Sequence, residues 1–326
     1  MRICLFAALF LFALAPRPAA AQEFSLPLDC RDFCAVQNYV DVDPGPSAKD
    51  PDCGPLSYNG HDGLDFRVPA ARAALGVAVL APAAGVIRGA RDGETDGAFI
   101  AGGMAAIANK ECGNGVNIDH GDGWMSVICH MRRGSVRVHA GDHVDAGQTI
   151  GLIGLSGQTE FTHVHLTLMH NGAKVDPLTG AALGAETCGA AARTPASYWT
   201  PAARAQLAYR GARWFSSGFA GAGPSGSQSP DQIAAAPGRN AQALLYWAIA
   251  IGPRNGDVLS ARLIGPNGAV IAQVSRTQPR DQAQSWVNTG AVTPAGGWPA
   301  GVYRAEARLE RNGRVIDTRS ETLALR

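Results

Sequence analysis

The sequence predicts an all-β protein that is built from two antiparallel domains. Short apolar runs alternate with glycine turns between residues 58 and 180, and the same rhythm returns after residue 241. The 326 residues include 40 glycines and 20 prolines, which favours a chain with many turns. The length allows two domains of ordinary size, and a hydrophobic content of 46% is typical of globular proteins.

Residues 1–21 have the pattern of a secretory signal peptide. Arg2 precedes an apolar run from Ile3 to Ala15, and small residues at 19–21 offer a cleavage site. A retained N-terminal anchor is the alternative. Because the signal carries two arginines and no acid, its removal lowers the formal net charge of +1 to −1. That near-neutral chain argues against nucleic acid as a partner, and no later run is long enough to predict a transmembrane segment.

The cysteines predict disulfides in an oxidising compartment. An even number remains after the signal, which favours pairing over free thiols. Cys112 and Cys129 flank a predicted hairpin turn at 120–123, so they would lie nearly opposite each other and within disulfide reach. A cysteine-rich zinc site is less favoured, because no C-x-x-C pair occurs. The other pairings stay open among Cys30, Cys34, Cys53 and Cys188.

The first domain is predicted over residues 58–190, after a cysteine-containing extension at 22–57 with few strand signals. Its alternating apolar runs favour an antiparallel sheet. A segment at 92–111 breaks this rhythm and is interpreted as an inserted loop. The predicted strands are 77–80, 85–87, 116–118, 124–128, 148–153 and 164–168.

Residues 191–240 are predicted to contain one helix and a linker. Thr200 suits an N-cap, Pro201 suits the first helical position, residues 202–210 continue the helix, and Gly211 suits the C′ position. Residues 216–240 are rich in serine, glycine, alanine and proline, which is typical of a linker.

The second domain is predicted over residues 241–326 as a small immunoglobulin-like β-sandwich. Asn312-Gly313 is a strong hairpin signal. No histidine or cysteine occurs there, so metal chemistry in this domain is improbable. The predicted strands are 244–251, 258–264, 269–274, 303–309 and 315–319.

The histidines point to a metal site in the first domain. All 8 of them lie between His61 and His170. His163 and His165 are two residues apart in a predicted strand, so both side chains share one face. His61 and Asp65 are four residues apart in a loop that enters a strand, and Gly63 would let that loop turn. Imidazole and carboxylate are the ligands that a catalytic zinc uses.

These residues resemble the lysostaphin-like (LytM-type) zinc metallopeptidases. Residues 58–66 resemble the H-x-x-x-D motif of that family, and residues 161–166 its H-x-H motif. Residues 128–131 lie where the family has Tyr-x-His. The resemblance covers about residues 58–180, in the family's order. Further matching segments are 113–121, 141–144, 147–151 and 175–177.

The resemblance implies a role for each matched position. His61, Asp65 and His165 would bind one zinc ion, and His130 and His163 would be catalytic. Such a set leaves a position for water, which zinc acidifies. A neutral histidine beside it can take up a proton and later protonate the leaving amine.

The sequence departs from the family pattern at Ile128, at Thr162 and in the longer 92–111 loop. Each departure could alter the fit of a substrate. Asn114 and the remaining histidines are interpreted as structural or surface residues. These histidines are His120, His139, His143 and His170.

The resemblance implies a secreted or periplasmic zinc metalloendopeptidase that hydrolyses amide bonds in peptidoglycan stem peptides or cross-links. One alternative is a non-enzymatic relative that regulates other cell-wall hydrolases. Another is a wall-binding protein that binds through the C-terminal sandwich. Metal analysis and cell-wall clearing would separate the first alternative from the enzyme.

Overall fold

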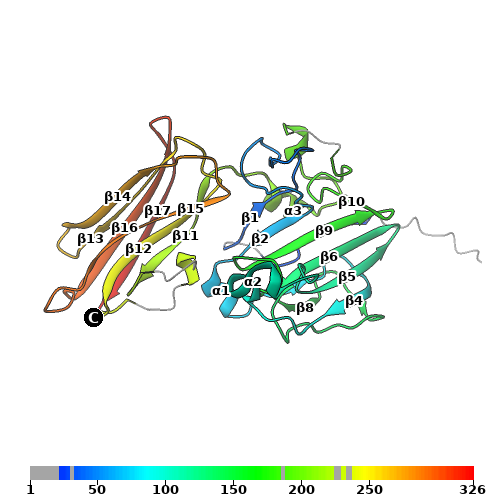
Figure 1. The fold of residues 1–326 in the computed structure, drawn as a ribbon, viewed down its shortest axis with the longest axis horizontal. Helices are drawn as coiled ribbons and strands as arrows, with labels where there is room; N and C mark the ends of the chain where they lie inside the picture. Colours follow the sequence, from blue (N-terminus) through cyan, green and yellow to red (C-terminus); the bar gives the residue numbers. More distant parts are fainter. Residues whose placement is uncertain (1–21, 30–32, 185–187, 224–228, 233–236) are drawn as a thin grey trace, which may run out of the picture.

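The computed structural model describes residues 22–29, 33–184, 188–223, 229–232 and 237–326. The signal peptide predicted at 1–21 lies outside these residues. The described chain is mostly β-strand, and Figure 1 shows a sandwich beside a larger sheet. In the described residues, no helix has both the length and the apolar character needed to cross a membrane.

The first domain is organised around an 8-stranded antiparallel sheet. Its strand order is β1-β2-β9-β6-β5-β4-β7, and β10 pairs with β9. Most strands predicted in this region form it, so the all-β prediction is confirmed. The strands are β1 (Ala35–Asn38), β2 (Leu64–Arg67), β4 (Gly85–Arg91), β5 (Asn114–Gly121), β6 (Trp124–Met131), β7 (His143–Val144), β9 (His163–His170) and β10 (Ala173–Val175).

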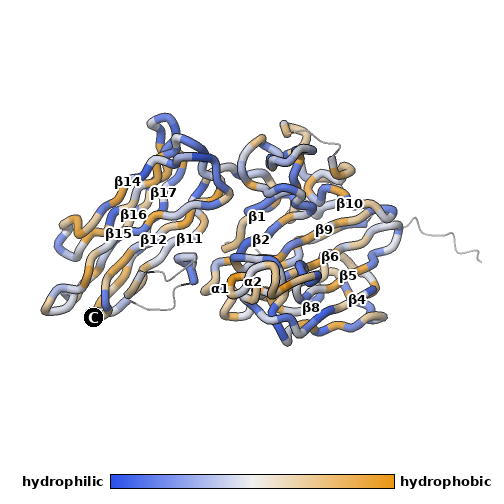
Figure 2. Tube along the Cα trace, viewed as in Figure 1, coloured by the Kyte–Doolittle hydropathy of each residue, from blue (hydrophilic) through white to orange (hydrophobic). Residues whose placement is uncertain are grey.

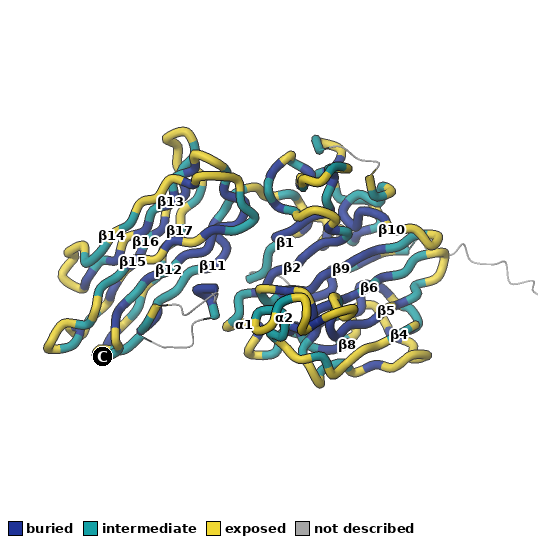
Figure 3. The backbone as a smooth tube through the Cα atoms, in the orientation of Figure 1, coloured by how far each residue is buried: buried dark blue, intermediate teal, exposed yellow. Residues whose placement is uncertain are grey.

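The middle of this sheet is the most buried part of the domain. Figure 3 colours much of β2, β9 and β6 dark blue, as expected for strands that are covered on both faces. The apolar side chains of Phe66, Val164, Leu166 and Ile128 are at most 1% exposed. Ile128, which replaces an aromatic residue of the family pattern, is therefore a core residue.

Shorter elements cover the sheet. β3 (Ala78–Leu80) pairs with β8 (Thr149–Leu152) in a separate 2-stranded sheet. The predicted insertion at 92–111 is not an irregular loop throughout, because it contains α2 (Ala98–Gly102) and a 3₁₀ turn at Gly103–Ala106. Helix α1 (Ala70–Ala74) follows β2, and further 3₁₀ turns lie at Ala191–Arg193 and Pro230–Gln232.

Three local predictions differ from the structure. Strand β1 lies in the extension at 22–57, where few strand signals occur. Pairing with β2 stabilises this strand, although its own residues give little indication of one. Helix α3 begins at Pro201 with Thr200 as its N-cap, as predicted, but ends at Leu207. Beyond it, Tyr209 leaves the helix to donate a hydrogen bond to Asp50 and to pack on Tyr39.

The third difference lies in the predicted linker. Residues Arg213–Ala220 form strand β11, which pairs along its length with β12. Its serines and glycine favour a linker when read alone. The apolar partner strand β12 supplies a packed neighbour that makes a strand the better state for this segment.

The C-terminal domain is a sandwich of a 3-stranded and a 4-stranded sheet. Alternate residues of each strand face inward, so Leu259, Ala261 and Leu263 pack opposite Leu244 and Tyr246 in one core. Hydrophobic residues follow β12 in Figure 2. The orders are β11-β12-β15 and β14-β13-β16-β17, with β12 (Ala243–Ile251), β13 (Val258–Ile264), β14 (Val270–Thr277), β15 (Gln284–Val292), β16 (Gly301–Arg311) and β17 (Arg314–Leu325).

The sandwich confirms the predicted second β-domain, with one edge strand placed differently from an immunoglobulin constant domain. Strand β14 pairs with β13 here, whereas the constant-type arrangement joins that fourth strand to the opposite sheet. The Asn312-Gly313 turn has φ values of 51° and 74°, as a two-residue hairpin turn requires.

The two domains share apolar and polar contacts. Phe215 and Ile251, from β11 and β12, belong to the hydrophobic core of the first domain. Arg254 of the second domain lies 3.0 Å from the carboxylate of Asp52. Arg67 of β2 donates a hydrogen bond to Gln284 of β15. The sandwich is therefore packed against the first domain rather than joined to it by a linker alone.

Disulfides tie the first domain together. The predicted pair Cys112–Cys129 is present, with a Cα–Cα distance of 4.8 Å across β5 and β6. Cys53 pairs with Cys188, and Cys34 is also disulfide-bonded. The described cysteines thus support the disulfide reading over a cysteine zinc site.

Candidate metal centre

The pairing of β2 with β9 brings the carboxylate of Asp65 next to the ring of His165. The two residues are directly opposite each other in the register of these strands. Asp65 Oδ1 lies 2.8 Å from His165 Nδ1. Asp65 is 2% exposed and His165 is 8% exposed, so this contact is buried.

His61 completes the cluster from the loop before β2. Its Nε2 lies 3.1 Å from Asp65 Oδ1 and 3.2 Å from His165 Nδ1. Gly63 lies at a bend in this loop, and the close approach of β9 is a second reason for a glycine there. A Cβ atom there would lie 2.5 Å from the Leu166 carbonyl oxygen and 2.7 Å from the His165 ring, so the absence of a side chain permits close approach to β9.

The spacing of these three ligand atoms fits a small tetrahedral metal ion. Metal–ligand bonds of zinc to nitrogen and oxygen place neighbouring ligand atoms about 3.3 Å apart in a tetrahedron. The three observed separations are 2.8, 3.1 and 3.2 Å. His61, Asp65 and His165 could therefore hold one metal ion together.

The outer atoms of the three residues are held by hydrogen bonds. His61 Nδ1 lies 2.6 Å from the Tyr39 carbonyl oxygen, which requires a proton on that nitrogen and leaves Nε2 as the electron-pair donor. Asn38 Nδ2 donates to Asp65 Oδ2 at 2.7 Å. His165 Nε2 lies 2.9 Å from Thr167 Oγ1. Such contacts fix the orientation of metal ligands.

Asn38 and Tyr39 also contact the cluster, and no motif in the sequence pointed to either residue. They come from the end of β1, in the extension whose role the motifs did not reveal. Neither residue type is diagnostic of a metal site. A strand just before the H-x-x-x-D segment would have been a signal for these contacts, because such a strand can pair with β2 and reach the cluster.

The charges around the cluster favour an ionised carboxylate. Burial raises the pKa of Asp65, but His61 and His163 hold it well below its usual value. Burial lowers the pKa of His165, but hydrogen bonds to Asp62 and Asp65 raise it to about 9. The positive charge of a metal ion would replace that of the proton at this nitrogen. Asp62 in turn pairs with Lys174.

His130 lies beside the cluster in a constrained backbone conformation. Its φ is +66°, which is uncommon for a residue with a side chain and is often found at functional sites. Its Nδ1 lies 2.8 Å from the Ser156 carbonyl oxygen and therefore carries the proton. Burial, with the positive charges of His163 and His165, lowers the pKa of His130 well below its usual value. The ring is therefore neutral, and its Nε2 is an acceptor.

His163 lies next to His130, with 4.5 Å between the ring centroids. Its Nδ1 lies 2.9 Å from the Phe161 carbonyl oxygen, and its Nε2 lies 3.4 Å from Asp65 Oδ1. His163 thus presents Nε2 to the metal cluster. All five residues that the sequence predicted for the site lie together.

The remaining histidines are placed elsewhere. His120 lies between the Ala84 carbonyl oxygen and the Ser126 hydroxyl. His170 stacks on Trp124. His139 and His143 are exposed. Asn114 is buried, and its side chain contacts the backbone of Glu94 and Met131, so it fastens the 92–111 segment to the sheet.

A pocket of about 400 Å³ opens over the cluster. His130 and His165 form part of its wall, and Tyr58 stands at one side with half of its surface exposed. The ring of Tyr58 lies 4.5 Å from that of His61. A substrate can therefore approach the histidines.

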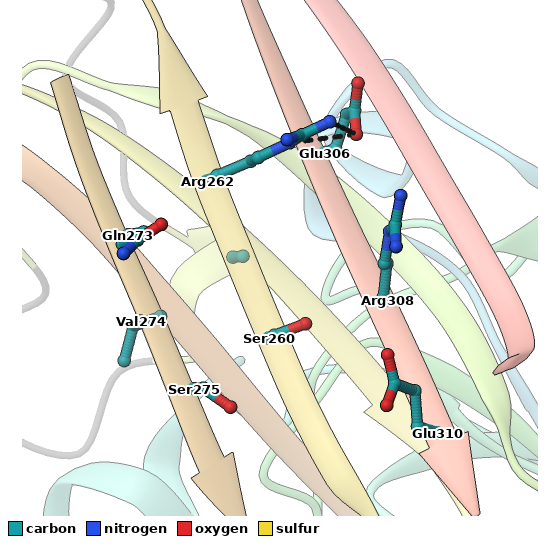
Figure 4. A pocket seen from close by; sticks show the side chains of 9 residues that line it. Ser260, Arg262, Gln273, Val274, Ser275, Glu306, Arg308 and Glu310 are labelled. Carbon is teal, nitrogen blue, oxygen red and sulfur yellow. Dashed lines mark hydrogen bonds and ion pairs between the residues drawn. The ribbon is translucent and has the colours of Figure 1, made fainter. Parts of the chain in front are cut away.

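A separate hollow of about 470 Å³ lies on the outer face of the 4-stranded sheet (Figure 4). Arg262 and Glu306 form an ion pair there at 2.7 Å. Arg308, Glu310 and serine side chains line the rest. No histidine or cysteine lines this hollow, whereas the His/Asp/His cluster lies in the first domain.

The chain is similar to several solved peptidase structures. The chain is similar to the catalytic domain of EnpA, a prophage-encoded M23 protein from Enterococcus faecalis, with 24% identity over 47% of this chain and 94% of that chain and a TM-score of 0.32. The catalytic domain of lysostaphin from Staphylococcus simulans is 25% identical, over 38% of this chain and 84% of that chain, with a TM-score of 0.27. A putative peptidase M23 from Pseudomonas aeruginosa is 29% identical, over 45% of this chain and 55% of that chain, with a TM-score of 0.28.

The part of the chain that holds the sheet and the His/Asp/His cluster is similar to a metallopeptidase family. Residues 59–177 match the model of peptidase family M23. The resemblance to lysostaphin-like peptidases is thus confirmed for the first domain, and the matched segment contains all five predicted site residues.

Proposed function

We propose that this chain is an exported zinc metalloendopeptidase that hydrolyses amide bonds in peptidoglycan stem peptides or cross-links. The observation that carries the proposal is the convergence of His61 Nε2, Asp65 Oδ1 and His165 Nδ1 within 3.2 Å of one another, with two further histidines beside them. The M23 match supports the peptidase class, and the family resemblance supports the cell-wall substrate.

Zinc would be held by His61, Asp65 and His165, and when bound it supplies an acidified water and an electrophile for the scissile carbonyl. The chain's own groups then handle the protons. His130 and His163 each donate from Nδ1 to a backbone carbonyl, which leaves Nε2 as the acceptor nitrogen of each ring. A proton taken up at one Nε2 makes that ring a donor, which can stabilise a developing oxyanion and then protonate the leaving amine.

Export is supported by the disulfides and by the N-terminal signal pattern. Cys112–Cys129 and Cys53–Cys188 are bonds that persist in oxidising compartments. We propose a secreted or periplasmic location. Detection of the protein in the medium or in a periplasmic extract, with cleavage after residue 21 shown by N-terminal sequencing, tests this part.

The metal and catalytic assignments are tested by a pair of single variants. We expect His165→Ala to abolish stoichiometric zinc binding, because it removes one of three ligands. We expect His163→Ala to keep zinc but to lower kcat for muropeptide hydrolysis by about 100-fold or more, because a proton-transfer group is lost. Elemental analysis and mass spectrometry of the released muropeptides provide the measurements.

His139→Ala is the matched control, because this exposed histidine lies away from the cluster. It should retain zinc and activity. Full activity of His163→Ala would overturn the role of His163. A zinc-loaded wild-type protein that leaves every peptidoglycan type intact would contradict the enzyme and favour a regulator of other hydrolases.

A further inference from the structure

A second groove, between the two domains, adjoins the metal-centre pocket. It has a volume of about 400 Å³ and is lined by Tyr58 and Phe161 on one side and by residues 280–284 of the sandwich on the other. Tyr58 also lines the metal-centre pocket, so the two spaces share this side chain in their walls. The groove thus lies next to the metal-centre pocket.

The aromatic walls connect the groove to the site residues. Tyr58 lies against His61, and the ring of Phe161 lies 4.7 Å from that of His163. Phe161 also covers the guanidinium of Arg67 at 4.7 Å. A ligand in the groove would therefore lie against aromatic rings that pack on the site histidines.

The sandwich presents side-chain amides to this groove. The Oε1 atom of Gln284 accepts a hydrogen bond from Arg67, and the Oε1 atom of Gln282 accepts one from Gln278. Because their oxygens are engaged, these two amides turn their NH₂ groups away from those donors. Within the described residues, neither NH₂ group has a hydrogen-bond partner.

Two amide donors separated by one residue suit an extended peptide. Carbonyl groups recur along an extended chain, so two neighbouring donors can each meet one of them. The charged groups that line the groove, Glu160, Arg280 and Asp281, have both signs and do not select a strongly charged ligand. A neutral peptide backbone is the ligand that this combination fits.

We propose that the interdomain groove binds the peptide part of the substrate in an extended conformation, with Gln282 and Gln284 of the C-terminal domain donating to its carbonyl oxygens. This inference rests on the proposed function, because it takes the peptide to be the one that passes the metal centre. It gives the sandwich a direct part in substrate binding.

Glutamate substitutions test the two donors without removing their acceptor oxygens. Gln284→Glu keeps an oxygen for Arg67, and Gln282→Glu keeps one for Gln278, but each loses its NH₂ group. Gln273→Glu is the matched control, because it adds the same charge to the same domain at the outer hollow of Figure 4. All three are made in a zinc-loaded His163→Ala background, so that binding is measured without turnover.

The measurement is the affinity for a fluorescently labelled, cross-linked muropeptide dimer, obtained by anisotropy. We expect Gln282→Glu and Gln284→Glu each to weaken binding by about fivefold to tenfold, the loss of one hydrogen bond. Gln273→Glu should leave the affinity unchanged. Equal affinity in all variants would overturn the groove assignment. Gln282 does not contact Arg67. Weaker binding by Gln282→Glu would therefore come from the lost donor and not from a change in the Arg67 contact between the domains.

Hydrolysis by the same variants with His163 restored separates the two proposals. If wild-type protein cleaves the dimer but the glutamate variants bind it normally, the groove assignment fails and the enzyme stands. If wild-type protein binds the dimer in a manner sensitive to Gln282 and Gln284 but cleaves no substrate, the enzyme fails and the groove stands.

Discussion

At the scale of single residues, the site depends on groups that hold the predicted ligands as much as on the ligands themselves. Asp65 directs one oxygen to His61 and His165 and the other to Asn38. Asn38 is 5% exposed, and its Oδ1 atom has no hydrogen-bond partner in the described residues. The hydrogen bond that Asn38 donates to Asp65 accounts for a polar side chain at this buried position.

We expect Asn38→Ala to weaken zinc affinity by about 10- to 100-fold, because the Asp65 carboxylate loses the contact that orients it. Competition with a chromophoric chelator gives the affinity. Asn117→Ala is the control, because Asn117 is an exposed asparagine of the same sheet. Equal zinc affinity in both variants would show that Asn38 does not position the ligand.

At the scale of secondary-structure elements, the β5–β6 hairpin is fixed at both ends. The Cys112–Cys129 disulfide closes its open end next to His130, whose backbone N–H donates to the Cys112 carbonyl oxygen at 2.9 Å. Near the turn, His120 bridges the Ala84 carbonyl oxygen, just before β4, and the Ser126 hydroxyl of β6. This bridge needs a neutral imidazole, with one nitrogen donating and the other accepting.

We expect the His120 bridge to make stability depend on pH. Burial lowers the pKa of His120 below its ordinary value, so the folded state binds this proton less readily than the unfolded state. The stabilisation is complete above the unfolded pKa of about 6.5 and decreases as the pH falls from there toward the folded pKa. The effect is at most about 1.4 kcal/mol per pH unit for one proton.

Urea unfolding of metal-free protein between pH 5 and 7.5 measures this dependence. The slope of the unfolding free energy against pH should be smaller in His120→Gln than in the wild type. His139→Gln serves as the control, because His139 is a side chain with 87% exposure. If His120→Gln retained the wild-type slope, the bridge would not be the titrating element.

At the scale of the whole molecule, Arg67 joins the domains at a fully buried position. It is 0% exposed, lies two residues after Asp65 and directly opposite His163 in the sheet, and donates to Gln37 and Gln284. Its guanidinium lies 3.6 Å from the carboxylate of Asp231 and over the ring of Phe215. The sandwich thus completes the burial of a charge from the metal-centre sheet.

We expect Arg67→Ala to lower the free energy of unfolding by about 3 to 5 kcal/mol, because it leaves the buried Asp231 carboxylate without its partner. Arg262→Ala removes an arginine from an exposed ion pair of the sandwich and should change it by less than about 1 kcal/mol. Denaturant titration compares the two. A small effect of Arg67→Ala would mean that the interface tolerates its loss.

We also expect removal of residues 241–326 to destabilise the first domain, because the sandwich helps to bury Arg67.

The parts of the fold that could be predicted are those with local signals. The Asn312-Gly313 turn, the N-cap at Thr200 and most strands of both domains follow from turn chemistry and from the alternation of apolar residues. Strands β1 and β11 could not be found in this way. Each is stabilised by a neighbouring strand rather than by its own composition, so the deciding interaction lies outside the segment.

The sequence by itself determined which residues are the candidates for the site. The spacing of His61 with Asp65 and of His163 with His165, together with the order of the motifs, was enough to predict the ligand set and the peptidase class. Tertiary structure alone decided what supports and borders that set. Asn38 reaches Asp65 across 27 residues of sequence, and Gln284 reaches Arg67 across 217. Contacts at such separations leave no local pattern, because they arise only when the strands pair and the two domains pack together.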